Sequence, residues 1–184
     1  MDIRYKNLLK KVEKPARYIG GEYNTPDMKK KHRVDYCLCF LDVYEVAMSN
    51  LGIRILYNLV NETDFAVCER CFAPWPDYFD ALKKEGLKLK SLETHKDLKD
   101  FDLLGFSVQY ELSYTTLLYM LDSADIPFRA ADRDESFPII AAGGPCGVNP
   151  EPYADFFDLI LLGDGEENTL QMLKIYDECK SSGF

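Results

Sequence analysis

The stretch that decides the fold reads Phe40-Leu-Asp-Val-Tyr-Glu-Val-Ala-Met-Ser-Asn-Leu-Gly52. Before it stands a short apolar run, Val34-Asp-Tyr-Cys-Leu-Cys-Phe40, which is typical of a buried strand. After it, apolar residues recur with helical spacing as far as Val60. The stretch is therefore a strand-to-helix junction, and in an open α/β sheet such junctions lie at the carboxyl edge, where ligands bind.

The same alternation repeats along the rest of the chain. Further strands are predicted at 65–72, 103–108, 137–142 and 157–162, and further helices at 77–86, 114–121 and 166–180. Strands separated by helices of this length indicate a parallel five-stranded sheet with helices on both faces, so we expect an α/β domain over residues 34–184. Right-handed crossovers then place all five strand-to-helix turns at one edge.

Residues 1–33 differ from the rest, because prolines and a Gly20-Gly21 pair punctuate them and apolar residues are sparse. This composition predicts an irregular N-terminal arm. The arm ends in a basic run, Lys29-Lys-Lys-His-Arg33, for which a solvated loop and an anion contact are both open.

Charge and hydropathy exclude some classes of function. The chain has 31 acidic and 22 basic residues, a net charge of −9, which opposes direct binding to nucleic acid. The N-terminus has no secretory apolar segment, and no apolar run approaches the roughly 20 residues that span a bilayer. We expect a cytoplasmic protein with no membrane contact, whose six cysteines are free thiols.

The predicted carboxyl-edge turns carry the candidate binding residues. We expect these to line a ligand edge in binding rather than acid–base roles, with no catalytic residue and no metal ligand among them: Asp42, Tyr44, Ser49, Ser107, Gln109, Gly143, Gly144 and Gly163. The Gly143-Gly-Pro145 sequence fits either close approach of a bulky ligand or a simple turn. For Gly163-Asp-Gly-Glu-Glu167, a helix cap by Asp164 is favoured over a phosphate loop, because three carboxylates would repel a phosphate.

The cysteines and histidines give weaker signals. Cys68 and Cys71 have C-x-x-C spacing, but residues three apart on a strand point to opposite faces, which argues against a metal site. Cys37 and Cys39 share a face and favour core packing. His32 and His95 stand in polar stretches outside the edge turns and are predicted to be exposed, which argues against a Ser-His-Asp site.

Taken together, the motifs resemble the N-terminal region of a radical S-adenosylmethionine (SAM) protein family, a family that begins with a cobalamin-binding-like domain. The residues that carry this resemblance are Pro15-Ala-Arg-Tyr-Ile-Gly-Gly-Glu-Tyr-Asn24, Asp42 to Gly52, Ile55-Leu-Tyr57, Glu69-Arg70, Ser91-Leu-Glu93, Phe101-Asp-Leu-Leu-Gly-Phe-Ser-Val-Gln-Tyr-Glu-Leu112, Gly143-Gly-Pro145 and Gly163-Asp-Gly-Glu166. The resemblance covers nearly the whole chain.

The resemblance implies a flavodoxin-like or Rossmann-like sheet that precedes a SAM-cleaving barrel. The C-x-x-x-C-x-x-C motif, which holds an iron-sulfur cluster in that barrel, does not occur in these 184 residues. We therefore expect the chain to stop before the barrel, which is then its partner within the same polypeptide, and we expect this chain alone not to cleave SAM.

The resemblance also raises the question of cobalamin. A cobalamin-binding domain would read D-x-H-x-x-G at the first junction, whereas this chain reads Asp42-Val-Tyr44-Glu-Val-Ala47. Tyrosine, with a pKa near 10, is a poor cobalt ligand at neutral pH. The hypothesis is a non-catalytic domain that positions cobalamin or an unidentified substrate next to the barrel, and the alternative is a stand-alone flavodoxin-like binding or interaction module.

Overall fold

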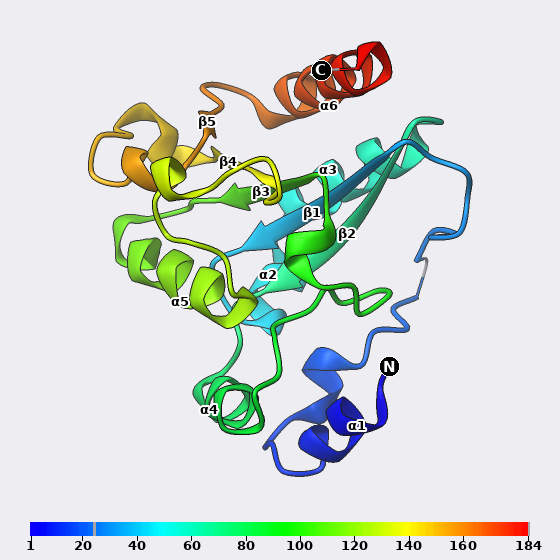
Figure 1. Ribbon diagram of the computed structural model, residues 1–184, viewed down its shortest axis with the longest axis vertical. Coiled ribbons are helices and arrows are strands. Elements are labelled where there is room, and N and C mark those ends of the chain that lie inside the picture. Colours follow the sequence, from blue (N-terminus) through cyan, green and yellow to red (C-terminus); the bar gives the residue numbers. More distant parts are fainter. Residues whose placement is uncertain (24, 184) are drawn as a thin grey trace.

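Five parallel strands form one sheet in the order β2-β1-β3-β4-β5 (Figure 1). The structure is a computed structural model that describes residues 1–23 and 25–183. The strands are β1 (Val34–Phe40), β2 (Ala66–Phe72), β3 (Leu103–Ser107), β4 (Ile139–Gly143) and β5 (Leu159–Ile160). This arrangement confirms the predicted parallel five-stranded α/β fold and is consistent with a flavodoxin-like or Rossmann-like domain.

Helices cover both faces of the sheet. They are α1 (Ile3–Leu9), α2 (Tyr44–Ser49), α3 (Leu51–Glu62), α4 (Pro76–Glu85), α5 (Tyr114–Ala124) and α6 (Gly165–Ser182). The buried side chains of α1, α4 and α5 pack on one face, and those of α3 and α6 pack on the other. Two 3₁₀ turns, η5 (Pro145–Val148) and η6 (Ala154–Phe156), stand between β4 and β5 where the other crossovers have an α-helix. Shorter 3₁₀ turns lie at Pro15–Tyr18, Leu98–Asp100, Glu111–Ser113 and Ala130–Asp132.

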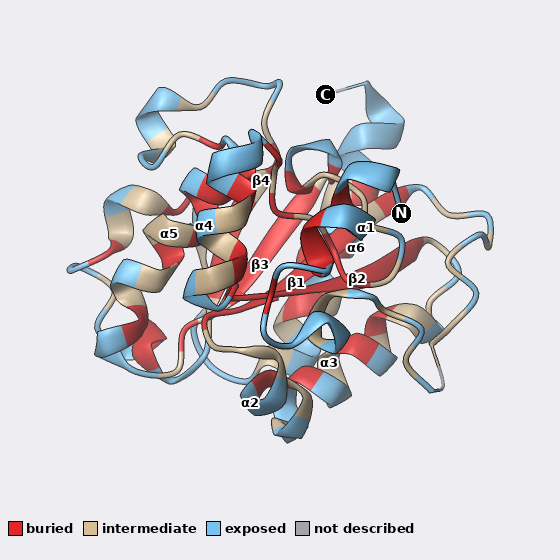
Figure 2. Ribbon diagram, turned by 90° about the horizontal axis from the view of Figure 1, so that it is seen from below, coloured by how far each residue is buried: buried red, intermediate tan, exposed pale blue. Residues whose placement is uncertain are grey.

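The strands are apolar on both faces, as a sheet covered by helices requires. On β1, Tyr36 and Leu38 pack toward α3 and α6, while Cys37 and Cys39 pack toward α4 and α5. The central strands are therefore buried almost throughout (Figure 2). The prediction that Cys37 and Cys39 are core residues is confirmed.

The chain reverses its direction across the sheet between β1 and β3. From β1 it crosses to β2 at one side, and from β3 it crosses to β4 at the other side. The helices that follow β1 and β3 therefore lie on opposite faces, which leaves a crevice outside the carboxyl ends of these two strands. The strand order thus predicts where on the sheet a ligand would bind.

The prediction of an irregular arm is wrong for the first residues of the chain. Residues Ile3–Leu9 form α1, which begins with the Asp2 side chain accepting a hydrogen bond from the Arg4 backbone N–H. Tyr5 and Leu8 are buried in the core on the α4 side, and the Tyr5 hydroxyl donates to the Lys88 carbonyl at 2.9 Å. Few apolar residues stand here, but their three- and four-residue spacing places them on one helix face.

A buried ion pair ties the edge strand β2 to the loop that leads into β3. Arg70 Nε lies 2.7 Å from Glu93 Oε1, and the two side chains are only 5% and 2% exposed. The guanidinium also lies 4.1 Å from the centre of the Tyr57 ring, and the Arg70 backbone N–H donates to Glu93 Oε2. Burial raises the pKa of Glu93 although Arg70 opposes that shift. Glu93 therefore depends on Arg70 to remain charged in the core.

We expect Arg70→Ala to lower the free energy of unfolding by about 3–5 kcal/mol, because it leaves the Glu93 carboxylate buried without a partner. The double variant Arg70→Met with Glu93→Gln removes both charges and should recover most of the loss. Urea denaturation measures both values.

The matched control is Arg129→Ala, which breaks the exposed pair between Arg129 and Asp155 at 2.6 Å. It should lower the free energy of unfolding by less than about 1 kcal/mol, because exposed ion pairs contribute little to stability. A double variant as unstable as Arg70→Ala would show that the buried charge is not the cause.

Candidate functional site

A cavity of about 310 Å³ opens on the face of the sheet that α3 and α6 cover, at the carboxyl ends of β1, β3 and β4. This volume is at the lower end of the range for small-molecule sites. Its floor consists of Tyr36 and Leu38 from β1, Gly105 and Ser107 from β3, and Ala141 and Gly143 from β4. Its sides consist of Asn50, Gly52 and Leu56 near the start of α3, and Gly165, Glu166 and Thr169 at the start of α6. The cavity lies at the crevice that the strand order predicts.

The floor is hollow because small residues are neighbours across the sheet. Gly105 pairs with Leu38 on one side and with Ala141 on the other, and Ser107 pairs with Gly143. Larger aliphatic residues at these positions would fill the space beneath α3 and α6. The cavity is therefore a consequence of composition in β3 and β4.

Tyr36 requires the glycine at position 105. A Cβ atom built on Gly105 would collide with the Tyr36 hydroxyl oxygen. The tyrosine ring thus lies directly over the β3 backbone and puts a polar atom beside the cavity floor. Glycine within a strand marks such close approach of another group to the backbone.

Five of the eight predicted binding residues line this cavity: Ser107, Gln109, Gly143, Gly144 and Gly163. Ser107 Oγ accepts a hydrogen bond of 2.7 Å from Gln109 Nε2, which leaves the serine proton and the Gln109 carbonyl oxygen free for other partners. Residues that follow three different strands thus meet at one hollow.

Asp42, Tyr44 and Ser49 lie at the same edge but do not line the cavity. Asp42 Oδ1 accepts from the Val43 backbone N–H at 2.7 Å, and its Oδ2 lies 3.3 Å from the Tyr110 hydroxyl, which donates to it. Ser49 is exposed and its hydroxyl donates to the Val46 carbonyl of its own helix. These side chains stabilise the first turn and α2.

The N-terminal segment holds Tyr44 away from the cavity. The Tyr44 hydroxyl donates to Glu22 Oε1 at 2.7 Å, and burial together with this carboxylate raises the pKa of Tyr44 to about 12. Beside it, Arg17 Nε lies 2.9 Å from Glu45 Oε2 at the start of α2. Tyr44 instead lines a hollow of only about 30 Å³ between the N-terminal segment and β2.

The two glycines of Gly143-Gly144-Pro145 have different roles. Gly144 has a φ of +101°, and a Cβ atom there would lie 2.8 Å from the Val108 carbonyl oxygen. Gly143 has no such strain, and a Cβ atom on it would make only ordinary contact with Leu161. The turn hypothesis thus applies to Gly144, while Gly143 opens space in the floor of the cavity.

The expected cap by Asp164 is wrong. Asp164 occupies the position before α6, but its side chain makes no capping hydrogen bond. The turn is closed instead by Asn168, whose Nδ2 donates to the Leu162 carbonyl at 2.8 Å. Because the asparagine closes the turn from within the helix, the Asp164 side chain stays in solvent.

Among the cavity residues that sequence reasoning missed are Tyr36, Gly105 and Thr169. Gly105 gave a usable signal, because a lone glycine inside an apolar strand indicates close approach of another group. Tyr36 and Thr169 gave none, since each sits in an ordinary strand or helix pattern.

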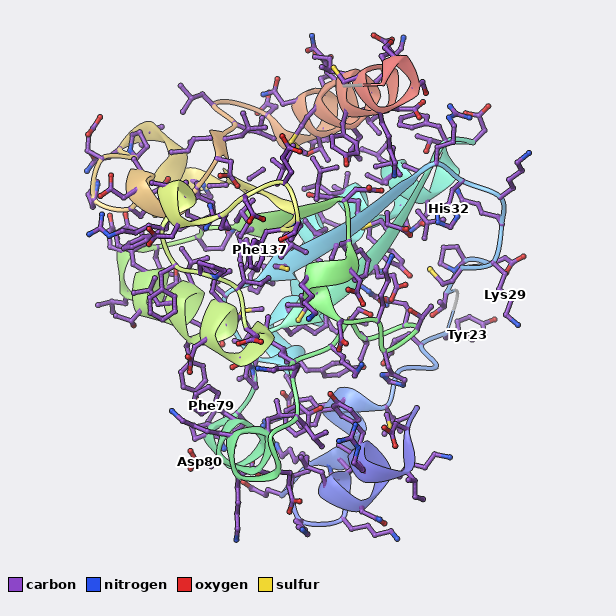
Figure 3. The ribbon with its side chains drawn as sticks, in the orientation of Figure 1. Tyr23, Lys29, His32, Phe79, Asp80 and Phe137 are labelled. Carbon is purple, nitrogen blue, oxygen red and sulfur yellow. The ribbon has the colours of Figure 1, made fainter. Side chains whose placement is uncertain are left out.

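The histidines lie outside the cavity and are partly buried rather than exposed as predicted. Figure 3 shows His32 at the amino end of β1, where its Nε2 lies 2.9 Å from Asp35 Oδ1. His95 lies after β2, and burial lowers its pKa. Cys68 and Cys71 belong to the cores on opposite faces of the sheet, as expected. Across the described residues, no three His, Cys, Asp or Glu side chains form a group that could hold a metal ion.

Residues 52–184 match a family model described as radical SAM proteins, N-terminal. The match includes α3 and every strand after β1, and hence most of the cavity. No curated protein matches the chain. Among the residues that the structure describes, none of the helices combines the length and the apolar character needed to cross a membrane.

The adjacent glycines give a direct test of the geometry. We expect Gly144→Ala to lower the free energy of unfolding by about 1–3 kcal/mol, because its backbone is left-handed and close to Val108. Gly143→Ala should change it by less than about 1 kcal/mol, since the new methyl group has room. Chemical denaturation of the two variants compares them, and equal losses would contradict the assigned roles.

Proposed function

The chain belongs to the family of N-terminal domains of radical SAM proteins, and from this premise we propose that it holds a ligand at the carboxyl edge of its sheet, next to a separate SAM-cleaving barrel. The observation that carries this proposal is the cavity of about 310 Å³ at the point where the strand order reverses. The domain itself is non-catalytic in this proposal, and the candidate residues at its edge have binding roles.

The family implies an iron-sulfur cluster and SAM in the catalytic part of the protein. The cysteines of this chain do not fit a cluster, since none has the C-x-x-x-C-x-x-C spacing and five of the six are buried. Burial raises the pKa of Cys37 to about 12, so its thiol stays protonated at neutral pH. The cluster and SAM therefore belong to the barrel.

Cobalamin and the substrate are the two candidate ligands for the cavity. The cavity is large enough for a small ligand, or for a ring at one end of a larger ligand. No imidazole lines it, and Tyr44 is held by Glu22, so the first turn supplies no ligand to cobalt. Cobalamin, when bound, supplies cobalt-centred chemistry that the protein chain lacks. The role of this chain is then to hold the cofactor or substrate through the cavity and the glycine turn around it.

Exposed apolar side chains at the carboxyl edge of the sheet, here called the rim, support the second half of the proposal. The turns and helix starts after the five strands all present large apolar side chains to solvent, and these are Val46, Leu51, Trp75, Tyr110, Leu112, Val148 and Leu162. Contacts connect these turns: the Tyr110 hydroxyl donates to Asp42, and the Cys146 backbone N–H donates to the Val108 carbonyl. Exposed apolar side chains that gather on neighbouring turns suit an interaction site.

The rim is also acidic, with Asp42, Glu45, Glu111, Asp164, Glu166 and Glu167 in the same turns. Of these, Glu45 is neutralised by Lys14 and Arg17. The partner that fits is therefore a protein surface with apolar and basic residues, and the family places a catalytic domain after this one. In this proposal the barrel covers the rim, so the ligand in the cavity faces the cluster and SAM.

Ligand binding is tested with hydroxocobalamin and a variant that fills the cavity. Hydroxocobalamin added to the full-length protein should change its visible spectrum and stay with the protein through a desalting column. Ala141→Leu extends a buried side chain into the cavity and should lower the retained cobalamin at least tenfold.

The control is Ala131→Leu, which adds the same atoms at an exposed position. It should retain cobalamin like the unaltered protein. If the full-length protein retains no cobalamin, the substrate becomes the ligand of the cavity. If Ala141→Leu retains it fully, the cobalamin site lies elsewhere.

Docking of the barrel is tested by photo-crosslinking in the full-length protein. We expect p-benzoylphenylalanine in place of Leu112 or Val148 to crosslink to residues of the barrel, which mass spectrometry of the digested product identifies. The control position is Phe128, which is exposed and follows α5 at the opposite edge of the sheet. Crosslinks from Leu112 and Val148 that stay within this domain, or join two copies of the protein, would contradict the assigned partner.

A further inference from the structure

The cavity carries information about the chemistry of its ligand. We infer that it takes an uncharged planar ring with hydrogen-bonding groups on its edge and rejects anionic groups. This inference rests on the proposed function and specifies the class of ligand. It follows from the charge, the free hydroxyl groups and the apolar walls of the cavity.

The lining is almost free of ionisable groups. Eighteen residues line the cavity, and none of them is lysine, arginine or histidine. The ionisable ones are Tyr36 and Glu166. Glu166 is exposed in the first turn of α6, so the cavity lining includes a carboxylate that reaches solvent. A carboxylate or phosphate that entered would lose its hydration and find no opposite charge, which is strongly unfavourable.

The N-terminus of α6 does not make the cavity favourable for anions. A helix N-terminus attracts anions through its free backbone N–H groups. Here Glu166 and Glu167 stand in the first turn and Asp164 precedes it, so three carboxylates already oppose a further negative charge. The helix end therefore favours a neutral acceptor, such as a ring nitrogen or a carbonyl oxygen, over an anion.

Two side chains that carry hydroxyl groups and are almost fully buried line the cavity. Tyr36 is 2% exposed and Thr169 is 4% exposed. Neither side chain forms a hydrogen bond within residues 1–23 and 25–183. Burial raises the pKa of Tyr36, so its hydroxyl stays protonated and can donate as well as accept. Each hydroxyl can therefore offer a ligand one hydrogen bond, Tyr36 from β1 and Thr169 from α6.

The remaining walls are aliphatic or small. Apolar surface comes from Leu38 of β1, Leu56 of α3 and Leu161 after β5. The small residues Gly105 and Ala141 leave space above the sheet. An apolar wall suits the face of a ring, while Tyr36, Thr169 and the Ser107–Gln109 pair suit its polar edge. A fully apolar ligand would leave those hydroxyls unpaired, which disfavours its binding.

Nicotinamide and nicotinate test the inference because they share a ring and differ in charge. We expect amide chemical shifts around the cavity, including Gly105 and Thr169, to move on titration of the ¹⁵N-labelled protein with nicotinamide. Nicotinate should bind at least tenfold more weakly. Tyr36→Phe and Thr169→Val remove one hydroxyl each and should weaken nicotinamide binding about three- to tenfold.

The matched control is Tyr153→Phe, because this change also removes one hydroxyl from an almost fully buried residue, but Tyr153 lies in the core on the other face of the sheet. It should bind nicotinamide like the unaltered protein, and all three variants should keep the amide spectrum of a folded chain.

Equal binding of nicotinamide and nicotinate, unaltered affinity in Tyr36→Phe and Thr169→Val, or an absence of shifts at the cavity would overturn the inference. The cobalamin and crosslinking experiments test the proposed function separately. Cobalamin retention without a preference for nicotinamide would refute the ligand chemistry alone. Preference for nicotinamide without cobalamin retention would leave the cavity as the substrate site.

Discussion

The close approach of Tyr36 to Gly105 is the contact on which the site depends. A parallel sheet normally fills the space beneath its helices with branched side chains. Here β3 has a glycine where the tyrosine ring of β1 crosses its backbone, and on β4 Ala141 lies opposite that glycine and Gly143 lies opposite Ser107. Because the large Tyr36 ring packs on the Gly105 backbone, space for the cavity remains beside the ring. The same contact puts a hydroxyl group where an aliphatic core would have none.

The N-terminal segment explains why the first turn does not contribute to the cavity. Gly20 packs so closely on the Leu92 carbonyl that any Cβ atom would collide with it. This contact fixes the segment so that Arg17 reaches Glu45 and Glu22 reaches Tyr44. The Tyr18 ring also stacks on Tyr78 of α4 at 3.8 Å between ring centres. These interactions hold α2 from outside, so Tyr44 is a structural residue in the place where a cobalamin-binding domain has its histidine.

The sequence predicted the sheet well because period and spacing determine it. Every predicted strand is present, and the helices at 77–86, 114–121 and 166–180 correspond to α4, α5 and α6 within a few residues. Alpha-helix α1 was missed because only a few apolar residues mark its buried face. The position of Ser107, Gln109, Gly143, Gly144 and Gly163 beside the cavity could be predicted because they end or follow strands. Tyr36 and Thr169 could not be found, since their importance comes from pairing between strands and from a helix that lies far along the chain.

The distribution of charge differs between the cavity, which is nearly uncharged, and the rim, which is acidic. The lining of the cavity has almost no charge, so binding there depends on shape and neutral polar groups. The rim at the same edge has exposed acidic and apolar residues, which in the proposed function would suit a basic and apolar protein surface. A partner that covers the rim would exclude water from the cavity and strengthen each hydrogen bond inside it. Ligand binding and domain docking would then stabilise each other, because each completes the burial of polar groups that the other begins.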